Sequence, residues 1–219
     1  MYMDKIIDKY NEYDNSINNI LSDLEGIILD DTNFEGNCFY FNKTFIRKKE
    51  LFNKQLNLFW IGTENHSNIC EIGFNAGHST LLLLLSNNKN INFTIFDINS
   101  HSYTEKCFEY IKKKFVDVNF EFVEGDSSVS IPKWIDNTKK FEHFDVIHID
   151  GCHQIDIVTK DFANSIKILK KNGLLIIDDV QKEHINNLVN TYILTGSFEE
   201  LTHFFETTLY PHRILKKII

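Results

Sequence analysis

The feature that most constrains the fold is the segment from Ile69 to Ser79, which reads Ile-Cys-Glu-Ile-Gly-Phe-Asn-Ala-Gly-His-Ser. Its apolar first half predicts a buried strand, and its two glycines predict a turn that leads into a helix. In open α/β sheets such a turn lies at the carboxyl end of the strand, where ligands bind. The segment therefore predicts an α/β fold with a cofactor-binding turn.

The spacing of the glycines argues against two common nucleotide sites. A dinucleotide turn needs G-x-G-x-x-G, but Asn75 interrupts that pattern. A P-loop needs Lys after its last glycine, whereas His78 follows Gly77 here. A wide turn remains, with room for a nucleoside and an amino acid, and S-adenosylmethionine has this shape. We expect its contacts among five residues of the segment, with the Glu71 carboxylate facing the ammonium: Glu71, Gly73, Asn75, Gly77 and Ser79.

Length and charge bound the remaining possibilities. A chain of 219 residues suits one structural domain, in which we expect an N-terminal helical cap over residues 1–65 and a core over 66–219. A net charge of -8 disfavours nucleic acid, because phosphate binding relies on clustered Lys and Arg. No signal peptide or membrane-spanning stretch is apparent, and the four cysteines form no C-x-x-C pair. We therefore expect a cytoplasmic protein that does not bind membranes.

Apolar runs alternate with helical patterns from residue 68 onward, which is typical of a Rossmann-like, doubly wound and mostly parallel sheet. The five expected parallel strands lie near 68–72, 92–97, 118–123, 144–149 and 173–178. A helix before the fifth strand is expected to stop at Asn172-Gly173, and another helix covers 182–194. Residues 199–206 and 211–218 predict an antiparallel C-terminal hairpin with a short turn around Leu209 and Tyr210, giving seven strands.

The N-terminal part predicts helices rather than strands. Its first helix carries one apolar stripe, formed by Ile6, Tyr10, Tyr13, Ile17, Ile20 and Leu24. A second helical stretch over 47–59 places its apolar residues on or near one face: Leu51, Phe52, Leu56 and Phe59. The stripe must dock either on this chain or on a partner, so a homodimer is one expectation.

Polar residues follow the predicted strands at the edge where ligands collect. Asp97 ends the second strand and is suited to accept hydrogen bonds from both ribose hydroxyls. After the third strand, Asp126 is expected to accept from an adenine amino group and Ser127 to cap the next helix. The structural alternatives are a helix-capping role for each acid and a plain strand-to-helix turn at the two glycines.

Acidic residues also follow the fourth and fifth strands. Asp150 leads into Gly-Cys-His153, and Asp178 is followed directly by Asp179. Three carboxylates suit Mg²⁺, which keeps waters that a substrate can displace, and His153 is placed to take a proton from a hydroxyl. Loop solvation and helix capping are the alternatives for these residues, and His148 is expected to be a satisfied core residue.

Taken in order, the motifs E-x-G-x-x-x-G, an acid after the second strand, G-D-S, D-G-x-H and D-D resemble a class I S-adenosylmethionine-dependent methyltransferase over residues 68–180. The last two motifs are similar to those of metal-dependent sugar and macrolide O-methyltransferases. That resemblance implies Mg²⁺ on Asp150, Asp178 and Asp179, with Asp150 also near the cofactor and His153 as the base. The catechol-type branch instead has Lys at the His153 position and Asn at the Asp179 position.

These observations favour an S-adenosylmethionine-dependent O-methyltransferase that acts on a hydroxyl of a sugar or other small molecule with the help of a divalent metal. One alternative is metal-independent methylation of another acceptor, whether a small molecule, a protein or a lipid. A second alternative is a noncatalytic protein that binds S-adenosylmethionine. A nicotinamide oxidoreductase would require NAD binding despite Asn75.

Overall fold

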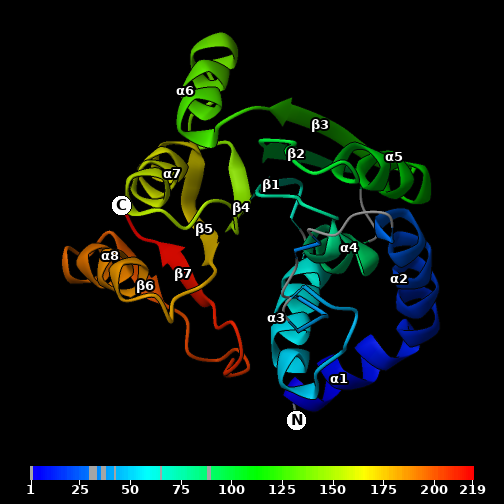
Figure 1. Cartoon of the computed structure of the whole chain (residues 1–219). Coiled ribbons are helices and arrows are strands. Elements are labelled where there is room, and N and C mark those ends of the chain that lie inside the picture. The colour runs from blue at the N-terminus through cyan, green and yellow to red at the C-terminus, as the bar shows by residue number, and fades with distance from the viewer. Residues whose placement is uncertain (1, 30–33, 36–37, 42, 65, 88–89) are drawn as a thin grey trace.

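The computed structural model describes residues 2–29, 34–35, 38–41, 43–64, 66–87 and 90–219. Within these residues, seven strands form one sheet in the order β3-β2-β1-β4-β5-β7-β6 (Figure 1). Neighbouring strands from β3 to β5 are parallel, while β7 is antiparallel to both β5 and β6. The strands are β1 (Asn68–Ile72), β2 (Ile91–Asp97), β3 (Val118–Glu124), β4 (Phe144–Ile149), β5 (Leu169–Ile177), β6 (Phe198–Glu200) and β7 (Arg213–Lys217). The Rossmann-like, seven-stranded fold predicted from the sequence is confirmed.

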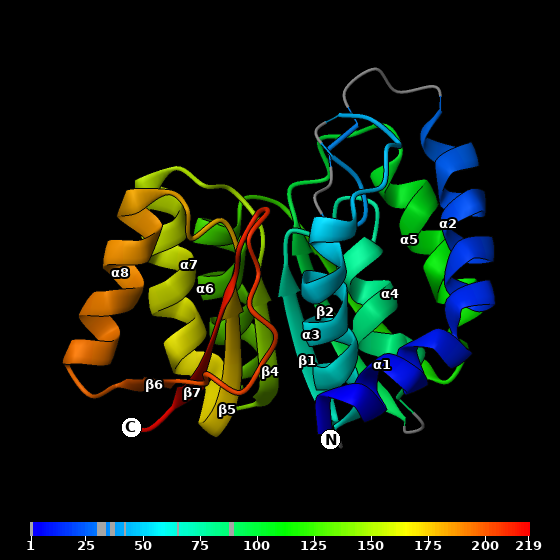
Figure 2. The same cartoon turned by 90° about the horizontal axis from the view of Figure 1, so that it is seen from below.

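Helices cover both faces of the sheet, which explains why β1, β2 and β4 are buried along most of their length. One face packs against α6 (Ser127–Thr138), α7 (Ile155–Ile168) and α8 (Glu183–Leu194). The other face packs against α4 (His78–Leu85) and α5 (Thr104–Lys114) (Figure 2). Ile69 and Cys70 belong to different core clusters because successive side chains of a strand point to opposite faces. No described helix has both the length and the apolar character needed to cross a membrane.

The N-terminal helices lie on the same side as α4 and α5 (Figure 2). They are α1 (Tyr2–Glu12), α2 (Asp14–Ile28) and α3 (Phe52–Thr63), with a 3₁₀ turn, η1 (Lys49–Leu51), before α3. The predicted first helix is therefore two helices with a break at Tyr13. Helix α1 contacts α3 and α2 contacts α5, so the apolar stripe docks on this chain.

Helix α3 begins later and ends later than the predicted stretch over 47–59. It is buried around most of its circumference rather than along one face, including its polar residues Lys54, Gln55 and Asn57. Buried polar groups need partners. Gln55 accepts a hydrogen bond from the Tyr10 hydroxyl at 2.8 Å and donates to the Cys38 carbonyl at 3.0 Å. Helix α3 is therefore an internal element that joins the N-terminal helices to the sheet.

The predicted C-terminal hairpin forms, but its first strand ends at Glu200 rather than at residue 206. Residues 201–212 form a long connection in place of a short turn around Leu209 and Tyr210. Asn57 of α3 explains this, because its amide donates to the Phe205 carbonyl at 2.8 Å and accepts from the Phe205 N–H at 2.8 Å. These bonds to a helix replace the pairing that would have extended the strand.

The helix stop predicted at Asn172-Gly173 is also wrong, since α7 ends at Ile168 and this pair lies within β5. Lys217 of β7 supplies the reason. Its ammonium donates to the Ile166 carbonyl at 2.8 Å and to the Leu169 carbonyl at 2.9 Å. A cation at a helix C-terminus satisfies carbonyls that lack a partner within the helix. The helix can therefore end before the glycine.

His78, the first residue of α4, is buried against the rings of Phe34, Phe39 and Tyr40. This burial lowers the pKa of His78 to about 4, so the folded protein holds a neutral imidazole that the unfolded chain protonates near pH 6.5. The unfolded state then binds more protons than the folded state as the pH falls from about 6.5 to about 4. The folded protein therefore loses stability as the pH falls from about 6.5 to about 4, because the buried His78 imidazole stays neutral while the unfolded chain takes up a proton.

We predict that His78→Phe reduces the loss of stability between pH 6.5 and pH 4 by up to about 3 kcal/mol, the free energy equivalent to the lowered pKa. Urea unfolding at the two pH values measures it, with the wild type as the reference. An equal decline in both proteins would contradict the assignment.

Candidate functional site

The turn after β1 brings the ends of two strands into close contact. Gly73 has φ +93°, and a Cβ atom there would lie 2.3 Å from the carbonyl oxygen of Asp150, at the end of β4. The Asp150 N–H also donates to the Ile72 carbonyl at 2.8 Å. Only glycine fits this backbone conformation and this approach. The turn predicted from the sequence is therefore present, and Gly73 fixes its distance from Asp150.

Asp97, the last residue of β2, holds this turn in place. Its Oδ2 accepts hydrogen bonds from the N–H groups of Phe74 at 2.7 Å and Asn75 at 3.0 Å. Its Oδ1 accepts from the Asn99 N–H at 2.7 Å. A carboxylate has about four acceptor sites, so these three bonds leave capacity for a ligand hydroxyl. Asp97 thus has a structural role that sequence reasoning did not anticipate, beside its predicted ribose contact.

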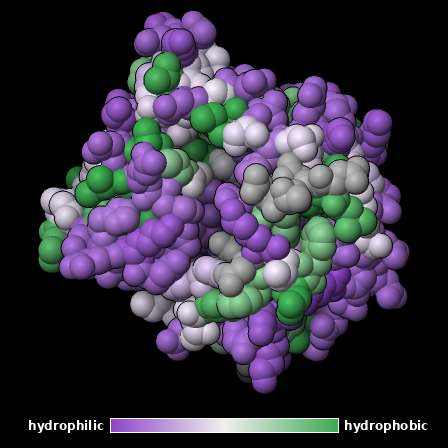
Figure 3. All heavy atoms as spheres, in the orientation of Figure 1, coloured by the Kyte–Doolittle hydropathy of each residue, from purple (hydrophilic) through white to green (hydrophobic). Residues whose placement is uncertain are grey.

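Two cavities lie along this edge of the sheet. The larger has a volume of about 400 Å³ and extends between Asp97 and Asp126. The smaller, of about 110 Å³, is lined by Ser79 and His153, among others. Both cavities are lined by Gly73, Asn75 and Asp150, so together they form one continuous rim site. In the space-filling view, hydrophilic residues border a hollow near the centre of the molecule (Figure 3).

The structure gives the helix-capping role to Asp126, as one of the structural alternatives had it, and not to Ser127. Asp126 caps α6, because its Oδ1 accepts from the Ser128 N–H at 2.8 Å, and Ser127 is the first residue of the helix. The expectation that Ser127 caps the helix is therefore wrong, since Asp126 precedes it with a non-helical backbone and a suitable acceptor. Both residues line the larger cavity.

A buried cluster of charged and polar side chains lies behind the rim site. The Lys54 ammonium is 2.5 Å from Asp178 Oδ2, and both side chains are almost wholly inaccessible. His148 Nδ1 lies 2.9 Å from Glu71 Oε1, and its Nε2 lies 3.7 Å from Asp178 Oδ2. His212 Nδ1 lies 3.5 Å from Asp178 Oδ1. Three strands, one helix and the C-terminal connection therefore meet at this cluster.

Burial and ion pairing have opposite effects on the pKa values of the cations in this cluster. Burial alone would lower the pKa of His148, but the carboxylates of Asp178 and Glu71 outweigh it and raise that pKa to about 10. Burial would also lower the pKa of Lys54, and Asp178 and Asp150 hold it above its ordinary value. Burial and the Asp178 charge raise the pKa of Asp150 well above its usual range. Lys54 and His148 are thus both cations at neutral pH.

Glu71 belongs to this cluster rather than to the cavities. It is fully buried, accepts a hydrogen bond from the Thr80 hydroxyl and pairs with His148. It lines neither cavity. His148 is buried and paired as expected of a core residue, but it is a charged one. The cofactor contact of Glu71 stays a prediction, and the geometry points instead to a role in fixing His148.

His153 and Asp179 form a pair at the smaller cavity. His153 Nε2 lies 2.7 Å from Asp179 Oδ2, and His153 lines the cavity with about 35% of its side chain exposed. Burial would raise the pKa of Asp179, but the hydrogen bond and charge of His153, with Gln181 and Lys182, hold it well below its usual range. His184 Nε2 lies 2.8 Å from the His153 carbonyl, which steadies the backbone of this loop. An imidazole held by a carboxylate is an arrangement suited to proton transfer.

Comparison with known proteins identifies the family. A model of a methyltransferase domain matches residues 70–180, about half of the chain and the part that carries the rim site. This chain belongs to the methyltransferase-domain family. Its fold is that of the class I S-adenosylmethionine-dependent methyltransferases, as the resemblance of its motifs implied. No curated protein matches the sequence.

Solved structures of other methyltransferases share the fold at low identity. The O-methyltransferase TomG from Streptomyces achromogenes, in complex with SAM, is 13% identical with a TM-score of 0.66, covering 91% of this chain and 89% of its own. The O-methyltransferase from Bacillus cereus, in complex with SAH, is 15% identical with a TM-score of 0.63, covering 94% and 91%. The N-methyltransferase NodS from Bradyrhizobium japonicum WM9, in complex with S-adenosyl-L-homocysteine, is 15% identical with a TM-score of 0.56, covering 91% and 98%.

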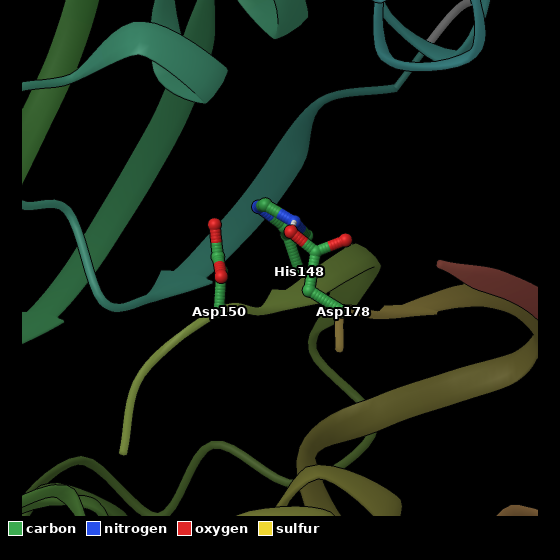
Figure 4. Close-up of side chains that lie close together, drawn as sticks. All are labelled: His148, Asp150 and Asp178. Atoms are coloured by element: carbon green, nitrogen blue, oxygen red, sulfur yellow. Dashed lines mark ion pairs between the residues drawn. The ribbon is translucent and has the colours of Figure 1, made fainter. Parts of the chain in front are cut away.

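The predicted metal ligands of this methyltransferase are not all brought together. His148, Asp150 and Asp178 each offer a ligand atom within 4.8 Å of the others, and the Asp178 carboxylate points at the His148 ring (Figure 4). Asp179 lies outside this group, because its carboxylate is turned to His153 and to Lys182 at 3.1 Å. The Lys54 ammonium occupies one side of Asp178. The donor set as arranged does not fit the Mg²⁺ site expected from the sequence.

Sequence reasoning missed Lys54 and His212, which come from segments without a recognisable motif. A signal for Lys54 was present, since Lys54, Gln55 and Asn57 interrupt an otherwise apolar helix. A polar residue inside an apolar helix is expected to be paired. No such signal marks His212, because it lies in an irregular connection and reaches the site only through the fold.

The approach of Gly73 to Asp150 can be tested against a glycine with similar backbone strain and open surroundings. Gly196 has φ +74°, and a Cβ atom there would meet no neighbour within 4 Å. We predict that Gly196→Ala costs about 1 kcal/mol of stability, from its backbone conformation alone. Gly73→Ala should cost more than about 3 kcal/mol because a backbone clash is added. Equal losses of unfolding free energy in the two variants, measured by urea unfolding, would show that the close contact between Gly73 and Asp150 leaves room for a side chain.

Proposed function

We propose that this methyltransferase uses S-adenosylmethionine to methylate a hydroxyl group of a sugar or another small molecule. The observation that carries the proposal is the His153–Asp179 pair, at 2.7 Å, whose His153 side lines the smaller cavity. An amine is nucleophilic once neutral, whereas an alcohol needs a base during methyl transfer. The family and the O-methyltransferases among the structural neighbours support this choice, although NodS shows that the fold also serves N-methylation.

The larger cavity is the proposed place of the adenosine. Asp97 would accept from the ribose hydroxyls, and Asp126 at the far end would accept from the adenine amino group, beside Ser127. The amino-acid end would then pass Gly73 and Asn75 into the smaller cavity. Gly73 and Asn75 line both cavities, which supports this path. A ligand that occupies both cavities must pass the turn after β1, to which these two residues belong.

The polar groups of the smaller cavity complete the proposed cofactor and acceptor site. Ser79 and Asp150 line it, and the Asp150 carboxyl is placed to face the cofactor ammonium, since Glu71 is committed to His148. A bound ammonium would favour the ionised carboxylate, against the burial and the Asp178 charge that raise the pKa of Asp150. Glu35 and His153 line the same cavity. Several polar groups converging in a small cavity suit a polyol acceptor better than an aromatic one.

The chemistry defines what His153 must do. A sulfonium is a good leaving group, so the harder task is to make an alcohol of pKa about 15 nucleophilic at neutral pH. His153 would take the hydroxyl proton as the oxygen–methyl bond forms and the methyl–sulfur bond breaks. Since Asp179 holds Nε2, the proton goes to Nδ1, and the Asp179 carboxylate stabilises the resulting imidazolium. Holding acceptor and donor together in adjoining cavities removes the entropy cost of their encounter.

Divalent-metal assistance is not part of this proposal. Lys54 pairs with Asp178, and Asp179 pairs with Lys182, so two of the three predicted ligands already have cationic partners. Mg²⁺ stays a prediction of the sequence. Binding, orientation and proton transfer in the proposed reaction all belong to residues of the chain itself.

Cofactor binding can be tested with a matched pair of aspartates. Asp97 and Asp145 each accept two backbone hydrogen bonds with Oδ2, Asp97 at the rim and Asp145 from Ser67 and Asn68 at the opposite end of the sheet. We predict that Asp97→Asn weakens S-adenosylhomocysteine binding roughly ten- to a hundredfold, the effect of losing charged hydrogen bonds. Asp145→Asn should leave affinity unchanged. Calorimetry measures both, and equal affinities for the two variants would contradict the placement of the nucleoside.

The base can be tested by replacing His153. His153→Ala is expected to lower kcat for a sugar acceptor by roughly 10²- to 10⁴-fold, the usual effect of losing a general base. S-adenosylhomocysteine affinity should be retained. The control is His143→Ala, since His143 precedes β4 at the other end of the sheet. Release of S-adenosylhomocysteine over a panel of sugars gives the rates, and full turnover by His153→Ala would remove it as the base.

A further inference from the structure

Lys54 is the residue that neither the motifs nor the proposed chemistry explain. It comes from the middle of α3 in the N-terminal part of the chain, whereas the carboxylate that it meets follows β5. Only 1% of the residue is exposed, although lysine is almost never fully buried without a partner. Its ammonium lies 2.5 Å from Asp178 Oδ2, so the two opposite charges are in direct contact.

This ammonium contacts a carboxylate oxygen that a metal ion in the cluster would also need. Asp150 and Asp178 offer oxygens within 4.8 Å of each other, and a divalent ion between them would have to share Asp178 with Lys54. An ammonium is a compact cation with three donors, so it can neutralise a carboxylate as a point charge without a coordination shell. Asp178 also has His148 at 3.7 Å and His212 at 3.5 Å, which surround it with nitrogen groups.

The contacts of the neighbouring carboxylates, Asp179 and Asp150, are consistent with the Lys54 ammonium as the cation of this cluster. Asp179, the remaining predicted ligand, is held instead by His153, Gln181 and Lys182. Asp150 lines both cavities while lying within the same cluster as Asp178. A cation beside Asp178 therefore does not contact the cofactor or the acceptor itself. It acts on them through Asp150, which lies between Asp178 and the cavities.

We propose that the Lys54 ammonium is the resident cation of the cluster formed by Asp150, Asp178 and His148, and that methyl transfer by this protein requires no divalent ion. Lys54 does not line either cavity, so it acts as a positioning residue through Asp178 and Asp150. The catalytic consequence rests on the proposed function, whereas the identity of the cation does not. Removing the ammonium should convert the cluster into a site that a divalent ion can enter.

Binding of Mn²⁺, followed by electron paramagnetic resonance after dialysis against EDTA, tests the cation directly. We expect Lys54→Met, which keeps a side chain of similar length without the charge, to bind one Mn²⁺ at least tenfold more tightly than the wild type. The control Lys49→Met removes an exposed lysine just before the same helix and should bind as the wild type does. Adding Asp178→Asn to Lys54→Met should abolish the gained binding. Equally tight binding by the wild type and Lys54→Met would overturn the proposal.

A second measurement needs only the wild-type protein, so it serves if Lys54→Met does not fold. Methyl transfer to a sugar acceptor should proceed at the same rate with EDTA and with added Mg²⁺. Loss of activity in EDTA that Mg²⁺ restores would overturn the proposal. Absence of turnover with every acceptor would count against the proposed function alone, because the Mn²⁺ titration reads the cation without any reaction.

Discussion

The buried ion pair between Lys54 and Asp178 is the interaction on which the rest of the site depends. Taking both charges out of water is costly, and removing one partner of such a pair typically costs about 3–5 kcal/mol. The pair therefore fixes α3 against the end of β5, and Asn57 of the same helix bonds His212 at 2.9 Å. One helix from the N-terminal part of the chain thereby sets both the charge behind the rim site and the course of the connection between β6 and β7.

The rim site follows from a different constraint, the close approach of the turn after β1 to the end of β4. Gly73 allows the turn after β1 to touch Asp150, and Asp97 secures that turn through two N–H groups. The space above the turn is then divided into a larger and a smaller cavity that meet at Gly73 and Asn75. The larger cavity beside a small polar one, with the His153–Asp179 pair at the second, is the arrangement on which the proposed methyl transfer to a hydroxyl rests.

The sequence predicted the features that local patterns encode. Buried strands, the turn at Gly73 and the acids at the strand ends each follow from a short stretch of residues and its position in a parallel sheet. What it could not predict came from distant partners. Asn57 stops the first hairpin strand, Lys217 ends α7 early, and Asp179 turns to His153 because that imidazole lies within reach. Lys54 is the extreme case, since its partner lies more than a hundred residues away and completes a cluster that its own segment does not reveal.

A crystal structure of the protein grown with S-adenosylhomocysteine and Mn²⁺ tests the central claim most directly, because anomalous scattering locates the metal without reference to any assay. The account predicts the nucleoside between Asp97 and Asp126, the Lys54 ammonium on Asp178, and no anomalous peak within that cluster. A manganese peak shared by Asp150 and Asp178, with Lys54 displaced, would contradict it.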